Sequence, residues 1–448
     1  MTARLPLDAL GHERLRHWQA RTFVVTWLAY VGYYLTRKSF SVAKVELKNP
    51  EVLGISTEAL SWMDGGYSIA YAIGQFSWGM LGDRFGTRAV VLAGMTASVV
   101  VAVATGCASS VAVIGVLMAM QGACQSSGWA PLAKNMGEFF PRRVRGRVMG
   151  LWCSNFALGS FIGAWVAGAG AMLGGTAVAL PAWRMTFLLP AAGLAAIAVV
   201  FAIVQANRPE DVGLPGPEVE AGEPETVVVA GQTVAEESEG SWAVIREVLR
   251  SRIVLLIAGV YLLVKPLRYL LMFWAPVYVS ERLGTSAAES GVIGSLFDLA
   301  GPLGIFAGGW LSDRIFGARR FPVMAITLAA GALALTVLPL VPATRSSLGV
   351  TLFLVGMLVY IPDSLAIGAA AIDFGTRRGA GTAVGLINGC GSIGQTVGVM
   401  LPGIVKQATG SATTPWNAIF LGLAGGLVIA AVLVAPQWNR LPATAARG

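Results

Sequence analysis

The segment GMLGDRFGTR (residues 79–88) lies between two long apolar runs and places an Asp-Arg pair, Asp83 and Arg84, at the end of the first run. The segment GWLSDRIFGARR (residues 309–320) repeats this arrangement in the second half of the chain, with Asp313 and Arg314 as the pair and one additional residue before the closing basic side chains. A repeated apolar-to-charged junction of this kind predicts that a stretch of the chain occurs twice.

Two further landmarks share nearly the same offset as these two Asp-Arg pairs. Arg37 and Arg268 each lie within an apolar run, and their separation equals that of Asp83 and Asp313 to within one position. A Trp-x3-Phe pattern begins at Trp183 and recurs at Trp416, again after almost the same interval. Three independent landmarks at one spacing predict a duplicated unit, and therefore two pseudo-symmetric halves.

The apolar runs in each copy are long enough to cross a bilayer as helices, which takes about 20 residues. We expect an all-α membrane protein with twelve spans, six in each half. The predicted spans lie near residues 22–44, 60–81, 89–110, 112–136, 146–172 and 184–206, then 253–279, 287–311, 322–342, 348–372, 380–405 and 416–436.

Composition supports this class. The chain has 448 residues, of which 55% are hydrophobic and only 12% charged. A soluble domain carries about 25% charged residues, and the mean hydropathy here is +0.67. These values exclude a soluble multidomain enzyme, a disordered chain and a disulfide scaffold.

The net charge of +8 does not indicate nucleic-acid binding, because the basic residues occur in small groups between apolar runs. If the N-terminus lies inside, 21 of the 32 basic residues fall on the inner side and six in the outer loops. Basic residues concentrate on the cytoplasmic side of membrane proteins. The pattern therefore predicts a multi-pass protein of the cell inner (plasma) membrane with both termini cytoplasmic.

The same pattern divides the chain into parts. We expect a cytoplasmic tail at 1–21, a six-helix bundle at 22–206, an acidic cytoplasmic linker at 207–250, a second bundle at 251–438 and a tail at 439–448. The linker combines many Glu with Pro and Gly, which is typical of disorder. The N-terminal tail contains a candidate short amphipathic helix at residues 10–18.

Cysteines and histidines indicate no metal or cofactor site. Each of the four cysteines lies in an apolar run without metal-ligand spacing, and both histidines precede the first span. No nucleophile–base arrangement is present either. The sequence therefore predicts neither an enzyme nor a cofactor-dependent protein.

Charges inside the predicted spans point to function. A charged side chain at the bilayer centre costs at least about 2.5–3.5 kcal/mol. Arg37 and Arg268 stand at equivalent places, so the pseudo-symmetry would bring them to one depth, facing each other. Two guanidiniums sharing one site repel, and an anion with several oxygens, phosphate above all, would relieve the repulsion through bidentate bonds. The alternative is that a carboxylate such as Asp298 neutralises each arginine.

Other cations in the spans leave more than one interpretation open. Lys265 lies one turn before Arg268, next to the helix-bending Pro266, and either lines the cavity or pairs with an acid of another span. Lys38 follows Arg37 by about 100° on a helix and is expected to point elsewhere.

Aromatic and amide side chains provide candidate wall residues of the site. Tyr30, Tyr33 and Tyr34 form a helical stripe with Arg37, and a second stripe follows on span two. The alternative is a packed aromatic face. The further candidates are Tyr67, Tyr71, Gln75, Asn155 and Asn388.

The acids supply candidates for gating and coupling. Asp83 and Asp313 at helix ends would pair with basic groups on a neighbouring helix and latch one state, although a solvated turn is the alternative reading of both segments. Asp298 and Asp363 are acids inside spans eight and ten and would serve coupling.

These features resemble the major facilitator superfamily, whose halves are parallel repeats. Within it, YYLTRKSF (residues 33–40) resembles the span-one motif of the organophosphate:phosphate antiporters, which include glycerol-3-phosphate and hexose-phosphate transporters. The similarity extends through SIAY, GWAP, RPEDVGL, RY followed by WAP, and RGAGT, which begin at Ser68, Gly128, Arg208, Arg268 and Arg378.

The resemblance implies that Arg37 and Arg268 bind the phosphoryl group and that the substrate is exchanged for inorganic phosphate. The tyrosines of span one would lie near the site, and Asp298 retains the acid of span eight. Gln75 replaces a Lys found in many members, and Asn155 and Phe273 replace a His and an Asp of the glycerol-phosphate member. These departures leave the organic part of the substrate open.

We therefore expect a monomeric antiporter for a small phosphorylated metabolite and inorganic phosphate. One alternative is a proton- or sodium-coupled carrier of another organic anion, such as a sugar acid, with Asp298 or Asp363 in the coupling role. The other is a membrane sensor of phosphorylated sugars that has kept the transporter fold.

Overall fold

The computed structural model describes residues 9–215, 227–229, 232–234, 246, 248–317, 319–366 and 380–440. Most of the predicted acidic linker, and with it the expectation of disorder, lies outside these residues, as do Arg377 and Arg378, both counted above among the inner basic groups. Helices dominate the described residues, and the predicted all-α fold with two six-helix halves is confirmed.

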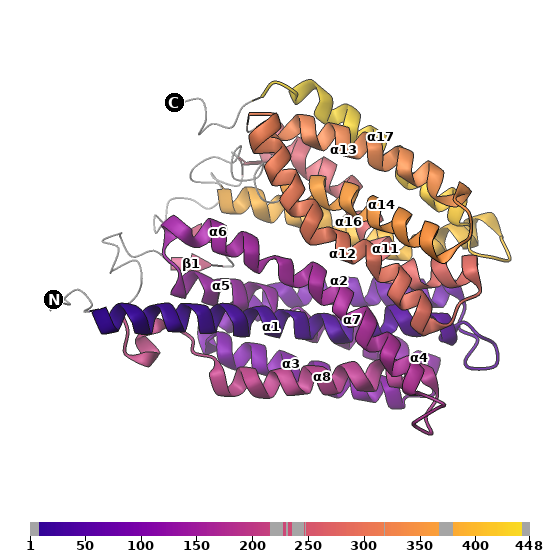
Figure 1. Cartoon of the computed structure of the whole chain (residues 1–448), viewed down its shortest axis with the longest axis horizontal. Helices are drawn as coiled ribbons and strands as arrows, with labels where there is room; N and C mark the ends of the chain where they lie inside the picture. Colours follow the sequence, from indigo (N-terminus) through magenta and orange to yellow (C-terminus); the bar gives the residue numbers. More distant parts are fainter. Residues whose placement is uncertain are drawn as a thin grey trace.

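The first half contains eight helical segments that make six crossings (Figure 1). Spans four and five are each built from two stacked helices, which meet at Ser126–Gly128 and at Cys153. The bounds are α1 (Ala9–Leu47), α2 (Thr57–Phe85), α3 (Thr87–Cys107), α4 (Val111–Gln125), α5 (Trp129–Phe139), α6 (Arg142–Trp152), α7 (Ser154–Leu173) and α8 (Ala182–Val204).

The second half repeats this order in its described residues, which leave out 367–379. Its bounds are α11 (Arg252–Leu283), α12 (Ala287–Trp310), the π-helical turn η2 (Leu311–Ile315), α13 (Arg320–Val337), η3 (Leu338–Leu340), α14 (Arg345–Leu365), α16 (Ala380–Thr409), α17 (Trp416–Val434) and η5 (Ala435–Gln437). Between the halves lie η1 (Pro209–Val212) and a small antiparallel hairpin, β1 (Val227–Val229) with β2 (Gln232–Val234).

Two details differ from the expected layout. The helix predicted in the N-terminal tail is not separate, because α1 runs without a break from Ala9 through the whole first span. The hairpin within the predicted linker adds two short strands to an otherwise helical chain.

Helix ends follow local chemistry. The side chains of Ser56, Ser286 and Thr344 each accept a backbone N–H from the first turn of α2, α12 and α14, which satisfies a donor that the helix itself leaves unpaired. Gly86 joins α2 to α3 with φ of 82°, a conformation that favours glycine. The first Asp-Arg segment is thus a tight reversal between two helices.

Nine segments in the described part of the chain are long and apolar enough to span a membrane by length and composition alone. The three remaining crossings are α1, α2 and α16, which are 39, 29 and 30 residues long. These three helices are long enough, but their polar and charged residues make them less apolar than the other nine segments. Two of them, α1 and α2, hold most of the predicted site.

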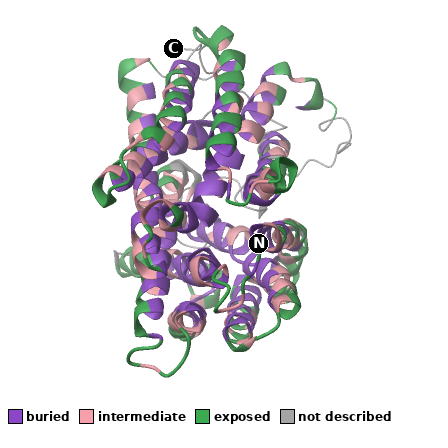
Figure 2. Ribbon diagram, turned by 90° about the vertical axis from the view of Figure 1, so that its right-hand side faces the viewer, coloured by how far each residue is buried: buried purple, intermediate pink, exposed green. Residues whose placement is uncertain are grey.

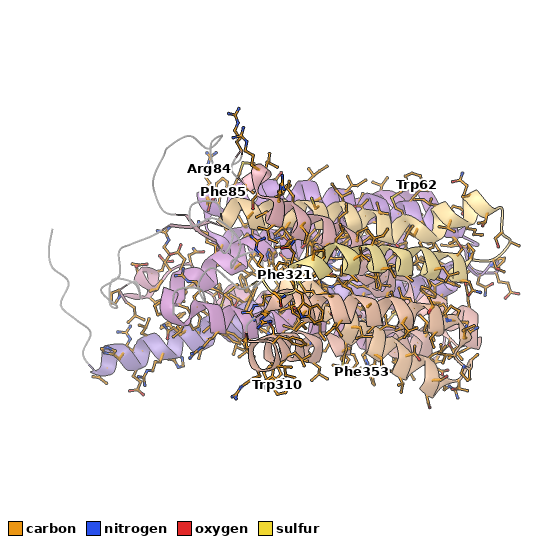
Figure 3. The ribbon with its side chains drawn as sticks, turned by 90° about the horizontal axis from the view of Figure 1, so that it is seen from above. Trp62, Arg84, Phe85, Trp310, Phe321 and Phe353 are labelled. Atoms are coloured by element: carbon orange, nitrogen blue, oxygen red, sulfur yellow. The ribbon has the colours of Figure 1, made fainter. Side chains whose placement is uncertain are left out.

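Burial follows the bundle arrangement. Buried residues lie inside each half and between the halves, while exposed residues cover the outside (Figure 2). Many exposed side chains are large and apolar, such as Trp62 and Trp310, which project from the ribbon in Figure 3. An apolar exterior over a core with buried charges is the arrangement that a bilayer favours, and the chain is a multi-pass membrane protein.

The two halves meet mainly along two helix pairs, α7 with α12 and α2 with α16, and α1 also contacts α11 and α12. Both the start of α1 and the end of α17 lie at one end of the molecule, here named the terminal end, and the opposite end is the far end (Figure 1). Glycines allow close packing within each half. A Cβ on Gly122 would overlap the carbonyl group of Tyr67, and one on Gly398 would overlap that of Pro266, which agrees with small residues at helix contacts in membranes.

Candidate anion-binding site

Arg37 lies buried on α1 and is held by uncharged groups. Its Nε donates to Oε1 of Gln125 over 3.0 Å. Its guanidinium stacks over the rings of Tyr34 and Tyr71, at 4.3 and 4.8 Å from the ring centroids. Among the described residues no carboxylate pairs with it, so its positive charge is not neutralised.

Arg268 lies equally buried on α11 but has an anionic partner. Its Nη1 donates to Oδ2 of Asp363 over 2.5 Å. Lys265 places its Nζ 3.1 Å from Oδ1 of the same carboxylate. One carboxylate therefore serves two cations, and this group of three side chains keeps one net positive charge. Of the two interpretations of Lys265, the pair with an acid of another span is the one observed.

Rings from both halves surround the two guanidiniums. Arg268 stacks on Phe156 of α7, in the first half, at 4.8 Å and on Tyr360 of α14 at 4.7 Å. Tyr269, whose ring lies 5.6 Å from Arg268, packs against Phe273. Phe273 in turn packs against Tyr67, which shares the Gln125 oxygen with Arg37. The structure therefore brings the two arginines into one buried neighbourhood between the halves.

The tyrosines predicted on α1 and α2 have different surroundings. Tyr67 donates its hydroxyl to Oε1 of Gln125 over 2.6 Å and stacks on Tyr71. Tyr30 packs instead against the rings of Trp129 and Trp152. The Tyr33 hydroxyl lies 2.7 Å from Ser127 Oγ and donates to Val91 O, so it is directed toward α3 and the α4–α5 junction. Tyr34 and Tyr71 thus stack on Arg37, Tyr67 shares Gln125 with it, and Tyr30 packs against Tyr34, whereas the Tyr33 hydroxyl is directed away from Arg37.

The predicted amides are dispersed. Asn155 is fully buried on α7, next to Phe156, and neither its amide nitrogen nor its oxygen has a hydrogen-bond partner among the described residues. Gln75 on α2 is half-buried, and Asn388 on α16 is exposed. Of these three residues only Asn155 is buried, and it adjoins Phe156, the ring on which Arg268 stacks.

Two buried guanidiniums with polar side chains around them can bind an anion that has several oxygens. Arg37 Nη2 and Arg268 Nε are buried and have no hydrogen-bond partner in the described part of the chain. An unpaired donor of this kind costs free energy unless a ligand satisfies it. The arrangement fits a phosphoryl or similar oxyanion.

Comparison with known proteins agrees with this fold. The family model of the Major Facilitator Superfamily matches residues 26–399. This chain belongs to the Major Facilitator Superfamily. Of the solved structures, a bacterial homolog of the human lysosomal transporter Spinster, in its inward-facing and unoccupied conformation, superposes with a TM-score of 0.70 at 14% identity, covering 94% of this chain and 95% of that one.

Relatives within the superfamily confirm the resemblance to transporters of organic phosphates. The glycerol-3-phosphate transporter of Bacillus subtilis (strain 168) is 29% identical, covering 97% of this chain and 94% of the relative. The glucose-6-phosphate exchanger SLC37A2 of Danio rerio is 26% identical, with 92% and 90% covered. The membrane sensor protein UhpC of Salmonella typhimurium is 28% identical, with 98% and 96% covered.

Asp298 pairs with neither Arg37 nor Arg268. It accepts a hydrogen bond from Lys38 Nζ at 2.9 Å, and Lys38 also donates to the carbonyl oxygen of Met272. Lys38 indeed points away from Arg37. The pair joins α1 of the first half to α12 of the second, and both side chains are buried. Asp298 is therefore paired with Lys38 and is not the partner of Arg37.

The Asp-Arg segments contact basic residues of their own half. Asp83 accepts a hydrogen bond from Lys134 of α5 over 2.5 Å, and Asp313 pairs with Arg320 at the start of α13. Arg84 and Arg314 are exposed, and Arg84 projects beside Phe85 at the terminal end in Figure 3. Each acid thus joins adjacent helices at the terminal end.

Sequence reasoning missed Gln125 and the ring of Phe156. Gln125 is a fully buried amide near the middle of span four, where α4 ends, and an amide in an apolar span is a signal that could have been weighed. Phe156 carried no such signal, since a phenylalanine in a span is ordinary.

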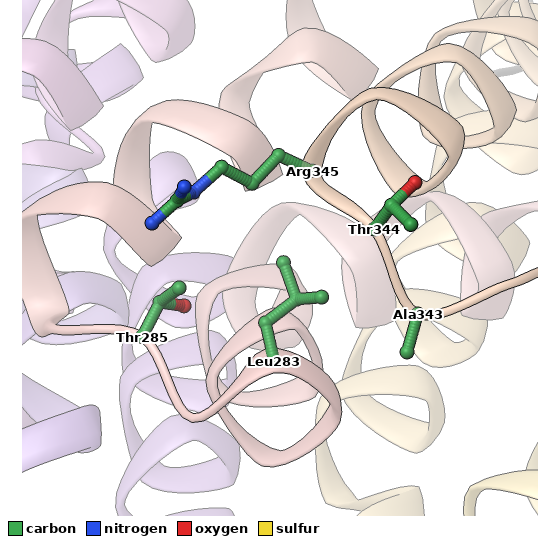
Figure 4. Close-up of a pocket in the computed structure, with 5 residues that line it drawn as sticks. All are labelled: Leu283, Thr285, Ala343, Thr344 and Arg345. Carbon is green, nitrogen blue, oxygen red and sulfur yellow. The ribbon is translucent and has the colours of Figure 1, made fainter.

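One pocket of about 310 Å³ lies at the far end, away from the arginines. It is lined by Leu283, Thr285, Ala343, Thr344 and Arg345, from the loops that follow α11 and precede α14 (Figure 4). The Arg345 side chain pairs with Glu289. None of the residues around Arg37 or Arg268 lines this pocket.

Proposed function

We propose that this chain is a secondary active transporter that exchanges a small phosphorylated metabolite for inorganic phosphate across the cell inner membrane. The observation that carries the proposal is the pair of buried arginines, one from each half, each with an N–H that has no partner among the described residues. Arg37 contributes one positive charge, and the group of Lys265, Arg268 and Asp363 contributes another. Two net positive charges match a phosphate ester, which carries about −1.5 to −2 at neutral pH.

The names of the relatives support the same class of substrate. One relative is a glycerol-3-phosphate transporter and another a glucose-6-phosphate exchanger. In this proposal Arg37 and Arg268 clamp the phosphoryl group, and no cofactor takes part. The tyrosines at Arg37 and the amide of Asn155 contact the organic part. The protein acts as a monomer with both termini in the cytoplasm.

Contacts between the halves suggest how the site alternates between the two sides. At the far end Lys48 pairs with Glu281, and Ser61 accepts the backbone N–H of Gly403. Deeper in, Lys38 and Asp298 join the halves. Rocking of one half against the other around the central site requires these contacts to break. We assign Asp298 and Asp363 to coupling, and Asp83 and Asp313 with Arg84 and Arg314 to gating at the terminal end.

Counterflow in proteoliposomes tests the proposal. Vesicles loaded with unlabelled phosphate should take up labelled phosphate without a proton or sodium gradient. Glycerol-3-phosphate, hexose-6-phosphates and phosphoglycerates added outside should compete to different extents and so identify the substrate. Absence of phosphate exchange together with gradient-driven uptake of a sugar acid would overturn the antiporter in favour of a coupled carrier.

A sensor is the second candidate, because one relative covering nearly the whole chain is named a membrane sensor protein. A sensor would use the same two arginines to bind a phosphorylated ligand. It would be stabilised against thermal unfolding by that ligand and would show no counterflow. Exchange at a measurable rate in purified protein excludes this alternative.

A further inference from the structure

The two arginines differ in which nitrogen atoms remain available. A guanidinium can bind two oxygens side by side either through Nη1 and Nη2 or through Nε and one Nη. In Arg37 the Nε donates to Gln125, and Nη2 is buried without a partner among the described residues. The available edge of Arg37 is therefore its Nη1–Nη2 edge.

Gln125 is itself held in one orientation. It lies at the end of α4 with no solvent exposure. Its Oε1 accepts hydrogen bonds from both Arg37 Nε and the Tyr67 hydroxyl, and its Nε2 donates to Thr36 Oγ1 over 3.0 Å. Because these contacts fill both ends of the amide, exchanging the places of its oxygen and nitrogen would set an N–H against the arginine. The amide oxygen is therefore directed at Arg37.

The neutrality of this partner matters for anion binding. An amide oxygen satisfies the Nε donor without cancelling the charge of the guanidinium, whereas a carboxylate at the same place would form an ion pair. The rings of Tyr34 and Tyr71 hold the guanidinium from its faces, again without a negative charge. Arg37 is thus fixed in place, charged and open on one edge.

Resting on the proposed function, we propose that Gln125 is a positioning residue that presents the Nη1–Nη2 edge of Arg37 to the phosphoryl group. Arg268 complements it with a different edge. Its Nη1 is taken by Asp363, and its buried Nε has no partner in the described part of the chain. The substrate therefore meets one end-on and one side-on guanidinium, which grip different pairs of phosphoryl oxygens.

Gln125→Glu and Gln125→Leu test this assignment against a merely structural role. Glu preserves the shape and the acceptor, so a structural role predicts that it is the milder change. Our proposal predicts the reverse, because the new carboxylate would pair with Arg37. Phosphate counterflow should be lost in Gln125→Glu, while Gln125→Leu should raise the half-saturation constant about tenfold, the value of one hydrogen bond to a charged group.

Thermal unfolding of the full-length protein in detergent, with and without inorganic phosphate, separates binding from folding. Gln125→Glu should keep the unfolding midpoint of the unchanged protein without phosphate and lose the phosphate-induced rise. Gln121→Leu is the matched control, since Gln121 is a buried amide one turn earlier on α4 whose polar atoms have no hydrogen-bond partner among the described residues. It should retain both exchange and the phosphate-induced rise.

Gln125→Glu with wild-type exchange, or a milder loss than in Gln125→Leu, would overturn the positioning role while leaving the proposed function intact. Equal losses in Gln121→Leu and Gln125→Leu would overturn it as well. Absence of exchange by the unchanged protein would overturn the proposed function, and this inference with it.

Discussion

Arg37 and Arg268 occupy equivalent places in the two halves, yet their surroundings have different charge. Arg37 is held by an amide and by tyrosine rings. Arg268 shares the carboxylate of Asp363 with Lys265. The duplication thus retains where the arginines stand but not what stands beside them. The second half therefore supplies a cation that is partly neutralised by Asp363. The first half supplies Arg37, whose charge is left for the substrate to neutralise.

This difference has an energetic consequence. Burying an unpaired charge costs several kcal/mol even after relaxation. For Arg37 that cost is reduced by two stacked rings, each worth about 0.5–2 kcal/mol, and by one hydrogen bond. Arg268 has a full ion pair. An anion therefore gains more from Arg37, and the two arginines are expected to respond differently to mutation.

The largest effect is expected from Arg37→Lys. Lysine keeps the charge but loses the planar fork and the Nε contact to Gln125. We expect phosphate counterflow to fall at least about a hundredfold, the combined loss of two charge-assisted hydrogen bonds. Arg268→Lys should also greatly weaken exchange, although its ammonium can still pair with Asp363. The measurement is initial exchange rate against phosphate concentration, with membrane insertion checked by yield of folded protein.

Arg282→Lys provides the control for these two changes. Arg282 also lies on α11, but it donates to the carbonyl oxygen of Val341 at the far end, away from the site. Phosphate exchange by Arg282→Lys should stay within about twofold of the unchanged protein, because a half-buried residue that contacts no part of the site has a small effect on it. Exchange at the unchanged rate in Arg37→Lys or Arg268→Lys would contradict the clamp.

Asp363→Asn tests the anionic half of the comparison. It leaves Arg268 and Lys265 without their carboxylate, and removing one partner of a buried pair costs about 3–5 kcal/mol. We expect a lower unfolding midpoint that phosphate restores to a greater extent than in the unchanged protein. The double change Lys265→Met with Asp363→Asn removes one positive and one negative charge and should recover part of the lost stability.

Asp64→Asn is the matched control, because Asp64 forms a fully buried pair with Lys44, which joins α1 to α2 and involves neither arginine. It should lower the midpoint as well, but phosphate should then shift that midpoint only as in the unchanged protein. Equal phosphate rescue of Asp64→Asn and Asp363→Asn would show that the Asp363 group is not part of the anion site.

The different partners of Arg37 and Arg268 show how much of the site the sequence could predict. The three landmarks at one offset indicated the repeat, and the long, mostly apolar stretches around them indicated the spans, because both can be recognised in the sequence itself. The same offset located Arg37 and Arg268. The sequence could not rank their partners, since Asp298 and Asp363 both lie in apolar spans. Which acid meets which cation depends on the rotation of each helix about its axis.

Gln125 is a contact of Arg37 that the local sequence could not identify. It contacts Arg37 from 88 residues away in the chain, and nothing in its local pattern distinguishes it from Gln121, one turn earlier. Tyr33, in contrast, lies on the predicted stripe, but its hydroxyl contacts Val91 and Ser127 instead of Arg37. A stripe that runs over two helical turns covers a wide sector of a helix, so periodicity alone includes residues that face a neighbouring helix.

The smallest effect is expected from the rings that hold Arg37. Tyr71 is half-buried and stacks on the guanidinium at 4.8 Å. Tyr71→Leu removes the π face, worth about 0.5–1 kcal/mol at a partly exposed position, so the half-saturation constant for phosphate should rise about two- to fivefold. Tyr71→Phe keeps the face and should differ little from the unchanged protein. If Tyr71→Phe lost as much as Tyr71→Leu, the hydroxyl rather than the ring would be the contact, and Arg37 would depend on its polar neighbours alone.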